Sequence, residues 1–228
     1  MFPFFFDWTI VLILPAFAFA MWAQSKVKGT YAHYSQVPSR LRLTGKDVAR
    51  RILDANGLQD VVVEPIAGQL TDHYHPKDRK IRLSEGIYGS NSLAALAVAA
   101  HESGHALQHQ AGYSPMTIRA NLVPVANLGS SAAFPLFFVG LIFPAFSWLM
   151  DLGIIFFTGA VLFHLVTLPV EFDASSRALK ILGNGSLLAP DEVAGAKKVM
   201  DAAAWTYVAA AAMALLQLVR LLLIRGRD

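Results

Sequence analysis

The residues best suited to chemistry are His101-Glu102-Ser103-Gly104-His105. On a helix, two histidines four residues apart share a face, so both imidazoles can bind one cation. A catalytic zinc ion takes such nitrogen ligands and keeps one position open for water. Glu102 lies beside the histidines and can take a proton from that water. The pattern H-E-x-x-H is a signature of zinc metalloproteases, and it predicts one Zn²⁺ per chain with Glu102 as the general base.

A helix with two ordinary hydrogen-bonded histidines is the simpler explanation of the same pattern. The stretch 93–100 before His101 contains only alanine, leucine and valine, which predicts a buried helix. Three ionisable side chains in a buried helix cost free energy unless a partner such as a metal ion compensates them. We therefore favour a metal site.

A third protein ligand is needed, and Glu171 is the leading candidate. The metzincin pattern would require glycine at Gln108 and histidine at Ala111, so that subclass is excluded. In gluzincins the third ligand is a glutamate on a later helix, which fits Glu171. The alternative is that Glu171 is a surface carboxylate paired with Arg177 or Lys180.

The composition predicts a membrane protein. The chain has 228 residues, of which 55% are hydrophobic and 15% charged, whereas about a quarter of the residues in a soluble domain are charged. A helix needs about 20 mainly apolar residues to cross a bilayer. We expect four spans, at 2–23, between Arg119 and Asp151, at 152–170 and at 202–219. Two of them separate His105 from Glu171, so the chain returns to the side of the membrane that it left.

We therefore expect a mainly α integral membrane protein, with about four transmembrane helices and a small α+β zincin-like catalytic unit. Within that unit the sequence predicts a helix capped by Thr44, a strand over 61–66, a strand over 80–83 that pairs with it through a turn at 75–78, and a helix over 93–110. The predicted divisions are an N-terminal transmembrane anchor (1–23), the catalytic unit (24–120), a two-span hairpin (121–170), a third-ligand helix with its connector (171–200) and a C-terminal transmembrane helix (201–228).

Charge and cysteine content limit the functional classes further. The chain has no cysteine, which excludes disulfides, thiolate metal sites and a cysteine nucleophile. Its net charge is +3 without a basic run, so we expect no nucleic-acid partner. Most lysines and arginines near span ends lie in 24–120 and 171–200, which predicts a multi-pass protein of the plasma membrane with the catalytic unit facing the cytoplasm. Arg220, Arg225 and Arg227 favour the opposite orientation.

Two segments together resemble a known family. The motif from His101 to His105 and the segment Pro169-Val170-Glu171-Phe172-Asp173-Ala174-Ser175-Ser176-Arg177-Ala178 are similar to the YugP-like bacterial membrane neutral zinc metallopeptidases, over nearly the whole chain. The second segment also resembles the E-x-x-A-D element of membrane gluzincins such as HtpX and the CAAX prenyl protease. That resemblance implies Glu171 as a zinc ligand and an aspartate four residues later, where this chain has Ser175. Asp173 and Ser175 are the candidates for the hydrogen bond to a zinc-bound histidine.

Further residues are candidates for supporting the ligands or contacting substrate. We expect Arg177 to pair with Asp173, four residues earlier on a helix. His73 and His75 lie in a predicted turn, where a polar loop is the simpler explanation. The full set of such candidates is Asp173, Ser175, Arg177, His73, His75 and Tyr113.

The sequence favours a membrane-embedded zinc-dependent endopeptidase acting on a peptide or membrane-protein substrate, and the resemblance implies a role in membrane-protein quality control. An extended substrate would pair with an edge strand, for which 80–83 and 61–66 are the candidates. One alternative is an intramembrane site-two-type protease, but the uncharged run before His101 is short for a span. The other is a non-catalytic metal-binding membrane scaffold, which would not need Glu102. The sequence does not indicate an oligomeric state.

Overall fold

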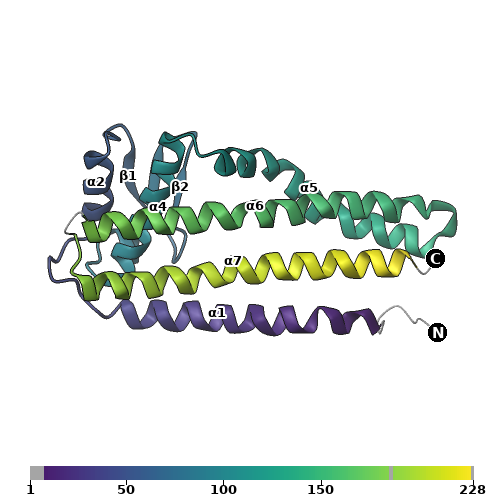
Figure 1. Ribbon diagram of the computed structural model, residues 1–228. Helices are drawn as coiled ribbons and strands as arrows, with labels where there is room; N and C mark the ends of the chain where they lie inside the picture. Colours follow the sequence, from purple (N-terminus) through teal and green to yellow (C-terminus); the bar gives the residue numbers. More distant parts are fainter. Residues whose placement is uncertain (1–7, 185–186, 227–228) are drawn as a thin grey trace. The chain divides into compact units, whose positions relative to one another are not determined.

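The computed structural model describes residues 8–184 and 187–226 and is mainly helical, with one small sheet (Figure 1). In chain order its elements are η2 (Trp8–Leu12), α1 (Leu14–Tyr34), α2 (Gly45–Ala55), β1 (Val62–Ile66), β2 (His73–His75), β3 (Lys80–Ser84), α3 (Glu85–Tyr88), α4 (Leu93–Gln110), α5 (Ser114–Ile142), η3 (Pro144–Phe146), α6 (Trp148–Asn184) and α7 (Pro190–Arg225). This content confirms the expected mainly α membrane protein with a small α+β part.

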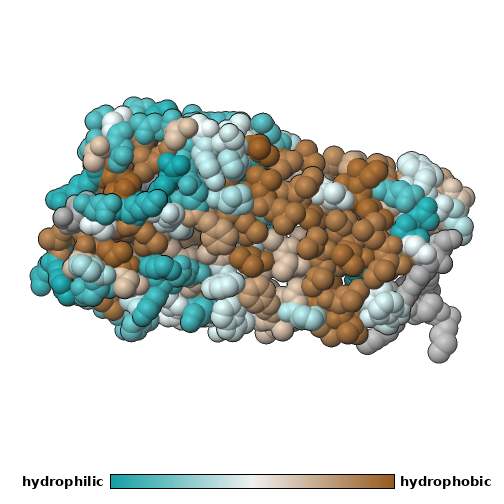
Figure 2. All heavy atoms as spheres, viewed as in Figure 1, coloured by the Kyte–Doolittle hydropathy of each residue, from teal (hydrophilic) through white to brown (hydrophobic). Residues whose placement is uncertain are grey.

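The chain divides into two compact units. One, which we call the membrane unit, comprises the described parts of 1–24, 117–168 and 206–228. The other, which we call the sheet unit, comprises 25–116 and 169–205. Apolar side chains gather over the helices of the membrane unit, and polar ones over the sheet unit (Figure 2).

Four helical segments of the described chain are long and apolar enough to cross a bilayer, which confirms the expected number of spans. They are Trp8–Tyr34, Ser114–Ile142, Trp148–Asn184 and Pro190–Arg225. The third is longer than predicted, because α6 continues through Pro169 instead of starting again there. A proline is tolerated inside a helix of a membrane bundle when neighbouring groups satisfy the carbonyl that it frees. The same helix therefore contains the third span and Glu171.

The sheet has the strand order β1-β3-β2, which differs from the predicted pairing. β1 and β3 pair in parallel, from Val62 opposite Lys80 to Ile66 opposite Ser84. The predicted hairpin between them is therefore wrong, because the expected turn at 75–78 connects β3 to β2 instead. Residues His73–His75 form that extra strand, antiparallel to β3. The buried Tyr74 explains the difference, since its ring anchors a strand too short to be seen in the pattern.

The two helices predicted in the polar region form as expected. Thr44 accepts a hydrogen bond from the backbone N–H of Asp47, whose carboxylate accepts one in return from the Thr44 N–H, so α2 begins with a capping box. Ser92 caps α4 through the N–H of Ala95. Most of α4 is buried among α2, α3 and the sheet, in the core that includes Ile52, Leu53, Ile81, Leu83 and Leu96. The H-E-x-x-H motif thus lies on a buried and well-fixed helix.

Candidate metal centre

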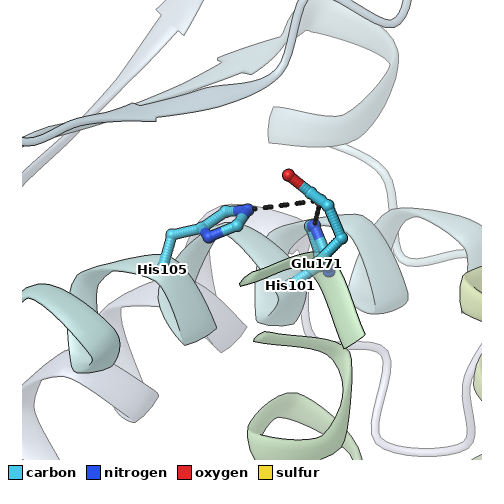
Figure 3. A group of neighbouring side chains, drawn as sticks. All are labelled: His101, His105 and Glu171. Atoms are coloured by element: carbon cyan, nitrogen blue, oxygen red, sulfur yellow. Dashed lines mark hydrogen bonds and ion pairs between the residues drawn. The ribbon is translucent and has the colours of Figure 1, made fainter. Parts of the chain in front are cut away.

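Two helices bring together three potential ligands, all of which belong to the sheet unit (Figure 3). His101 and His105 project from one face of α4, and Glu171 projects from α6. One ligand atom from each lies within 4.8 Å of those of the other two. The Glu171 Oε2 is 3.2 Å from His101 Nε2 and 3.6 Å from His105 Nε2. The sequence predicted these same three residues.

The spacing of the donor atoms suits a tetrahedral ion. Zinc lies roughly 2.0–2.1 Å from histidine nitrogen and carboxylate oxygen, which separates neighbouring ligand atoms by about 3.4 Å. The two separations from Glu171, 3.2 and 3.6 Å, bracket this value, and all three ligand atoms lie within 4.8 Å of one another. Three protein ligands also leave one of the four positions open, as in catalytic rather than structural zinc sites. The residues present therefore fit zinc.

Gly104 allows the two helices to approach closely enough for Glu171 to reach the histidines. A β-carbon at this position would lie 2.5 Å from the carbonyl oxygen of Ala174 on α6. Real β-carbons do not come so close to backbone atoms, so a larger residue would separate the helices. The requirement for glycine is not apparent from the sequence, because it depends on where α6 packs.

Each histidine has a hydrogen-bond partner on the nitrogen that faces away from the cluster. The Nδ1 of His101 is 3.1 Å from Ser175 Oγ. Ser175 thus contacts the histidine from the position where the resemblance implies an aspartate. The Nδ1 of His105 is 2.9 Å from Gln108 Oε1. Such contacts hold the rings of ligating histidines in orientation and set which nitrogen faces the metal.

Gln108 links His105 to α6, and this role was not predicted from the sequence. It is fully buried, and its amide donates to the Val170 carbonyl at 2.7 Å and to Asp173 Oδ2 at 2.9 Å. As expected, Arg177 also donates to this Asp173 oxygen, at 2.6 Å. The contact between Gln108 and His105 could have been predicted from their spacing, because side chains three residues apart on a helix are neighbours on one face.

Tyr113 and the two histidines of β2 lie outside the ligand cluster. The Tyr113 ring lies beneath the Arg177 guanidinium, 5.8 Å from its centroid, and its hydroxyl donates to the Pro169 carbonyl at 3.4 Å. His73 Nδ1 contacts the Thr71 carbonyl, and His75 Nδ1 contacts Asp78. Because side chains alternate along a strand, both point to the face opposite the buried Tyr74.

Glu102 lies beside the cluster without belonging to it. Its side chain is buried, and its Oε2 accepts a hydrogen bond of 2.9 Å from the backbone N–H of Tyr74. The Tyr74 hydroxyl is in turn 2.8 Å from Nδ1 of His109, two turns along α4. Tyr74 therefore attaches β2 to α4 through both its backbone and its side chain. A carboxylate held beside a potential metal site can accept a proton from water there.

Two carboxylates near His105 affect the pKa of its imidazole. Burial alone would lower the pKa of this imidazole, but the hydrogen bond to Glu171 and the charges of Glu102 and Glu171 outweigh burial and raise it. The cluster thus favours positive charge at the point where the three ligands meet. A divalent cation meets the same demand when it replaces the proton.

Comparisons with known proteins identify the family to which the chain belongs. A family model described as "putative neutral zinc metallopeptidase" matches residues 9–226. The Bacillus subtilis (strain 168) protein called "putative membrane protease YugP" is 48% identical over 221 residues, which cover 96% of this chain and 98% of the relative. No solved structure matches the chain.

Proposed function

Because the chain belongs to the neutral zinc metallopeptidase family, whose model matches nearly its full length, we propose that it is a membrane-embedded zinc-dependent endopeptidase. His101, His105 and Glu171 would hold one Zn²⁺, as in gluzincins. The observation that carries this proposal is the convergence of three ligand atoms from two helices within 4.8 Å. When bound, zinc supplies a water of lowered pKa and polarises the scissile carbonyl.

The protein side chains perform the remaining steps. Glu102 takes the proton of the attacking water and passes it to the leaving amine. Its hydrogen bond to the Tyr74 N–H supports this role, because it holds the carboxylate beside the ligands. The contacts of Ser175 and Gln108 keep both imidazoles pointing their Nε2 atoms at one place.

We propose that an extended substrate lies along β2. Of the two strands expected to hold it, 80–83 is the central strand with neighbours on both sides, so that candidate is wrong, whereas 61–66 contains β1, which is an edge strand like β2. β2 is an edge strand, and its Tyr74 N–H points toward Glu102 rather than into the sheet. Substrate backbone pairing with this edge would place a peptide bond beside the cluster.

The cellular setting that we propose follows from charge and family. The distribution of lysine and arginine supports a plasma-membrane protein with the sheet unit on the cytoplasmic side. The substrate is a peptide or a membrane protein, and the resemblance to membrane gluzincins supports a role in membrane-protein quality control.

Two features argue against the alternative functions. α4 has 18 residues and is not among the four segments able to span a bilayer in the described chain, which argues against an intramembrane site-two-type protease. A metal-binding scaffold without turnover would use Glu102 only to hold β2 through the Tyr74 N–H, a role that does not require a buried charged carboxylate.

The test is casein cleavage by the detergent-purified, zinc-loaded chain and two variants. Glu102→Gln should retain zinc and lower the rate by about a hundredfold or more, because it removes the general base. Glu85→Gln removes an exposed glutamate of the same unit and should leave the rate unchanged. Equal cleavage by wild type and Glu102→Gln would reject the mechanism. Zinc binding without cleavage by the wild type would favour a selective protease or the scaffold.

A further inference from the structure

The membrane unit contains a polar pocket between α5 and α6. Its volume is about 160 Å³. Asn127 and Ser130 of α5 and His164 of α6 supply its polar lining. The remaining lining residues are Val123, Ala126, Ala160 and Phe163. The proposed function makes no use of this pocket.

The residues that line the pocket belong to two of the four helical segments that are long and apolar enough to cross a bilayer. Asn127 follows Arg119 by eight residues, and His164 precedes Glu171 by seven. No acidic or basic residue lies within either interval. At 1.5 Å per residue these separations correspond to about 12 and 10 Å along the two helices. Both side chains therefore lie deeper than the lipid headgroups can easily reach.

The Asn127 and His164 side chains have no hydrogen-bond partner among the residues that the structure describes. Several hydroxyl groups of the same helices behave differently. Thr158 and Thr167 donate to carbonyls four residues earlier, and Ser130 and Ser131 donate to the backbone carbonyl of Asn127. Those hydroxyls are satisfied within their own helix. The Asn127 amide and the His164 imidazole are not.

Unsatisfied polar groups at this depth require a partner beyond the residues that the structure describes. An amide presents two donors and an acceptor, and a neutral imidazole presents one of each. Lipid tails supply neither, and an unsatisfied group in hydrocarbon costs several kcal/mol. A second membrane-embedded helix with hydrogen-bonding side chains would satisfy them, and the small Ala126, Ser130 and Ala160 allow such a helix to approach closely.

We propose that this pocket is the contact between two copies of the chain within the membrane. Asn127 and His164 are self-complementary, because each offers both a donor and an acceptor to the same residues of a second copy. Every copy of the chain would bear the free-energy cost of these unsatisfied groups whenever it is in the membrane. The partner must therefore be permanently available. A second copy meets that condition, whereas a substrate is present only transiently. Two-fold contacts of this kind are the commonest form of protein self-association.

The absence of cysteine from the chain allows a direct test by disulfide cross-linking. Val123 lines the pocket, is 42% exposed and lies four residues before Asn127 on the same helix face. The full chain carrying Val123→Cys, reconstituted alone in phosphatidylcholine vesicles and oxidised, should form a covalent dimer that persists as lipid is added to dilute the protein. Ile155→Cys is the control, because Ile155 is 65% exposed and lies about 180° around α6 from His164.

A second set of variants tests the role of the polar side chains. In the Val123→Cys background, Asn127→Ala should weaken association roughly tenfold, whereas Asn127→Gln should preserve it. Asn121→Ala removes an exposed asparagine of the same helix outside the pocket and should have no effect. Circular dichroism and zinc content check that each variant folds.

Two results would overturn the proposal. One is cross-linking of Val123→Cys no greater than that of Ile155→Cys, which would leave water or a different protein as the occupant. The other is equal dimer formation by the Asn127→Ala and Asn121→Ala chains. Neither measurement depends on hydrolysis, so the proposed peptidase activity and this association can fail separately.

Discussion

At the scale of single residues, the orientation of the two imidazoles depends on side chains that do not contact the metal position. Ser175 contacts His101, and Gln108 contacts His105 while it also bonds to α6. These contacts restrict both rings to rotamers that aim Nε2 at Glu171. Losing one of them frees the ring and weakens the whole ligand set.

Ser175→Ala should weaken zinc binding by about tenfold or more, because the Nδ1 of His101 loses its partner. Competition with a chromogenic chelator measures this affinity. Ser176→Ala changes the exposed neighbouring serine and should bind zinc as the wild type does. Ser175→Asp introduces the aspartate of the membrane gluzincins that this segment resembles and should retain tight binding. Equal affinity of the two alanine variants would contradict the role of Ser175.

At the scale of secondary-structure elements, the site depends on the close packing of α4 against α6. The contact point is Gly104, one residue before the second histidine of the motif. The start of α2 depends on local hydrogen bonds instead, namely the capping box of Thr44 and Asp47. The contact at Gly104 depends on tertiary packing, whereas the capping box can be predicted from the sequence.

Gly104→Ala should destabilise the protein by about 1–3 kcal/mol and lower its zinc content, because the added methyl group forces α4 away from Ala174. Gly86→Ala is a suitable control, since a β-carbon there meets no atom within 4 Å. Thermal unfolding in detergent and metal analysis measure the two effects. Full zinc occupancy in Gly104→Ala would show that the helices can separate without loss of the site.

Thr44→Ala should destabilise α2 by about 1 kcal/mol at neutral pH. The side-chain and backbone hydrogen bonds from Thr44 lower the pKa of Asp47. A carboxyl group whose pKa is lower in the folded state contributes stability above its unfolded pKa of about 3.9 and loses it as the pH falls through the folded value. The difference in unfolding temperature between wild type and Thr44→Ala should therefore narrow in acid. A constant difference from pH 7 to pH 3 would contradict this.

At the scale of the whole molecule, the three proposed metal ligands come from segments separated by two candidate membrane spans. His105 precedes α5, and Glu171 lies on the helix that contains the third span. A bound ion would connect α4 to α6 directly. Metal binding should therefore stabilise the folded chain as a whole rather than a local loop.

Removal of zinc with a chelator should lower the unfolding temperature of the detergent-purified chain. A ligand present at 100 times its Kd stabilises the folded state by about 2.7 kcal/mol, so the shift should be several degrees and reversible with added zinc. His101→Ala removes a ligand and should show no shift on chelation. A chelator effect of equal size in that variant would indicate that the metal binds elsewhere.

The local features of this protein follow from its sequence, because each depends on neighbours a few residues apart. Four apolar segments, the cap of α2 and the i, i+4 histidines of α4 are of this kind, and the return of the chain after two spans also pointed to Glu171. Only the tertiary structure decided the parallel pairing of β1 with β3, the strand at Tyr74, the need for glycine at position 104, the link from Gln108 to α6 and the choice of Ser175 over Asp173 as the partner of His101. Each of these depends on which distant segment packs against the residue, and no periodicity or spacing along the chain encodes that contact.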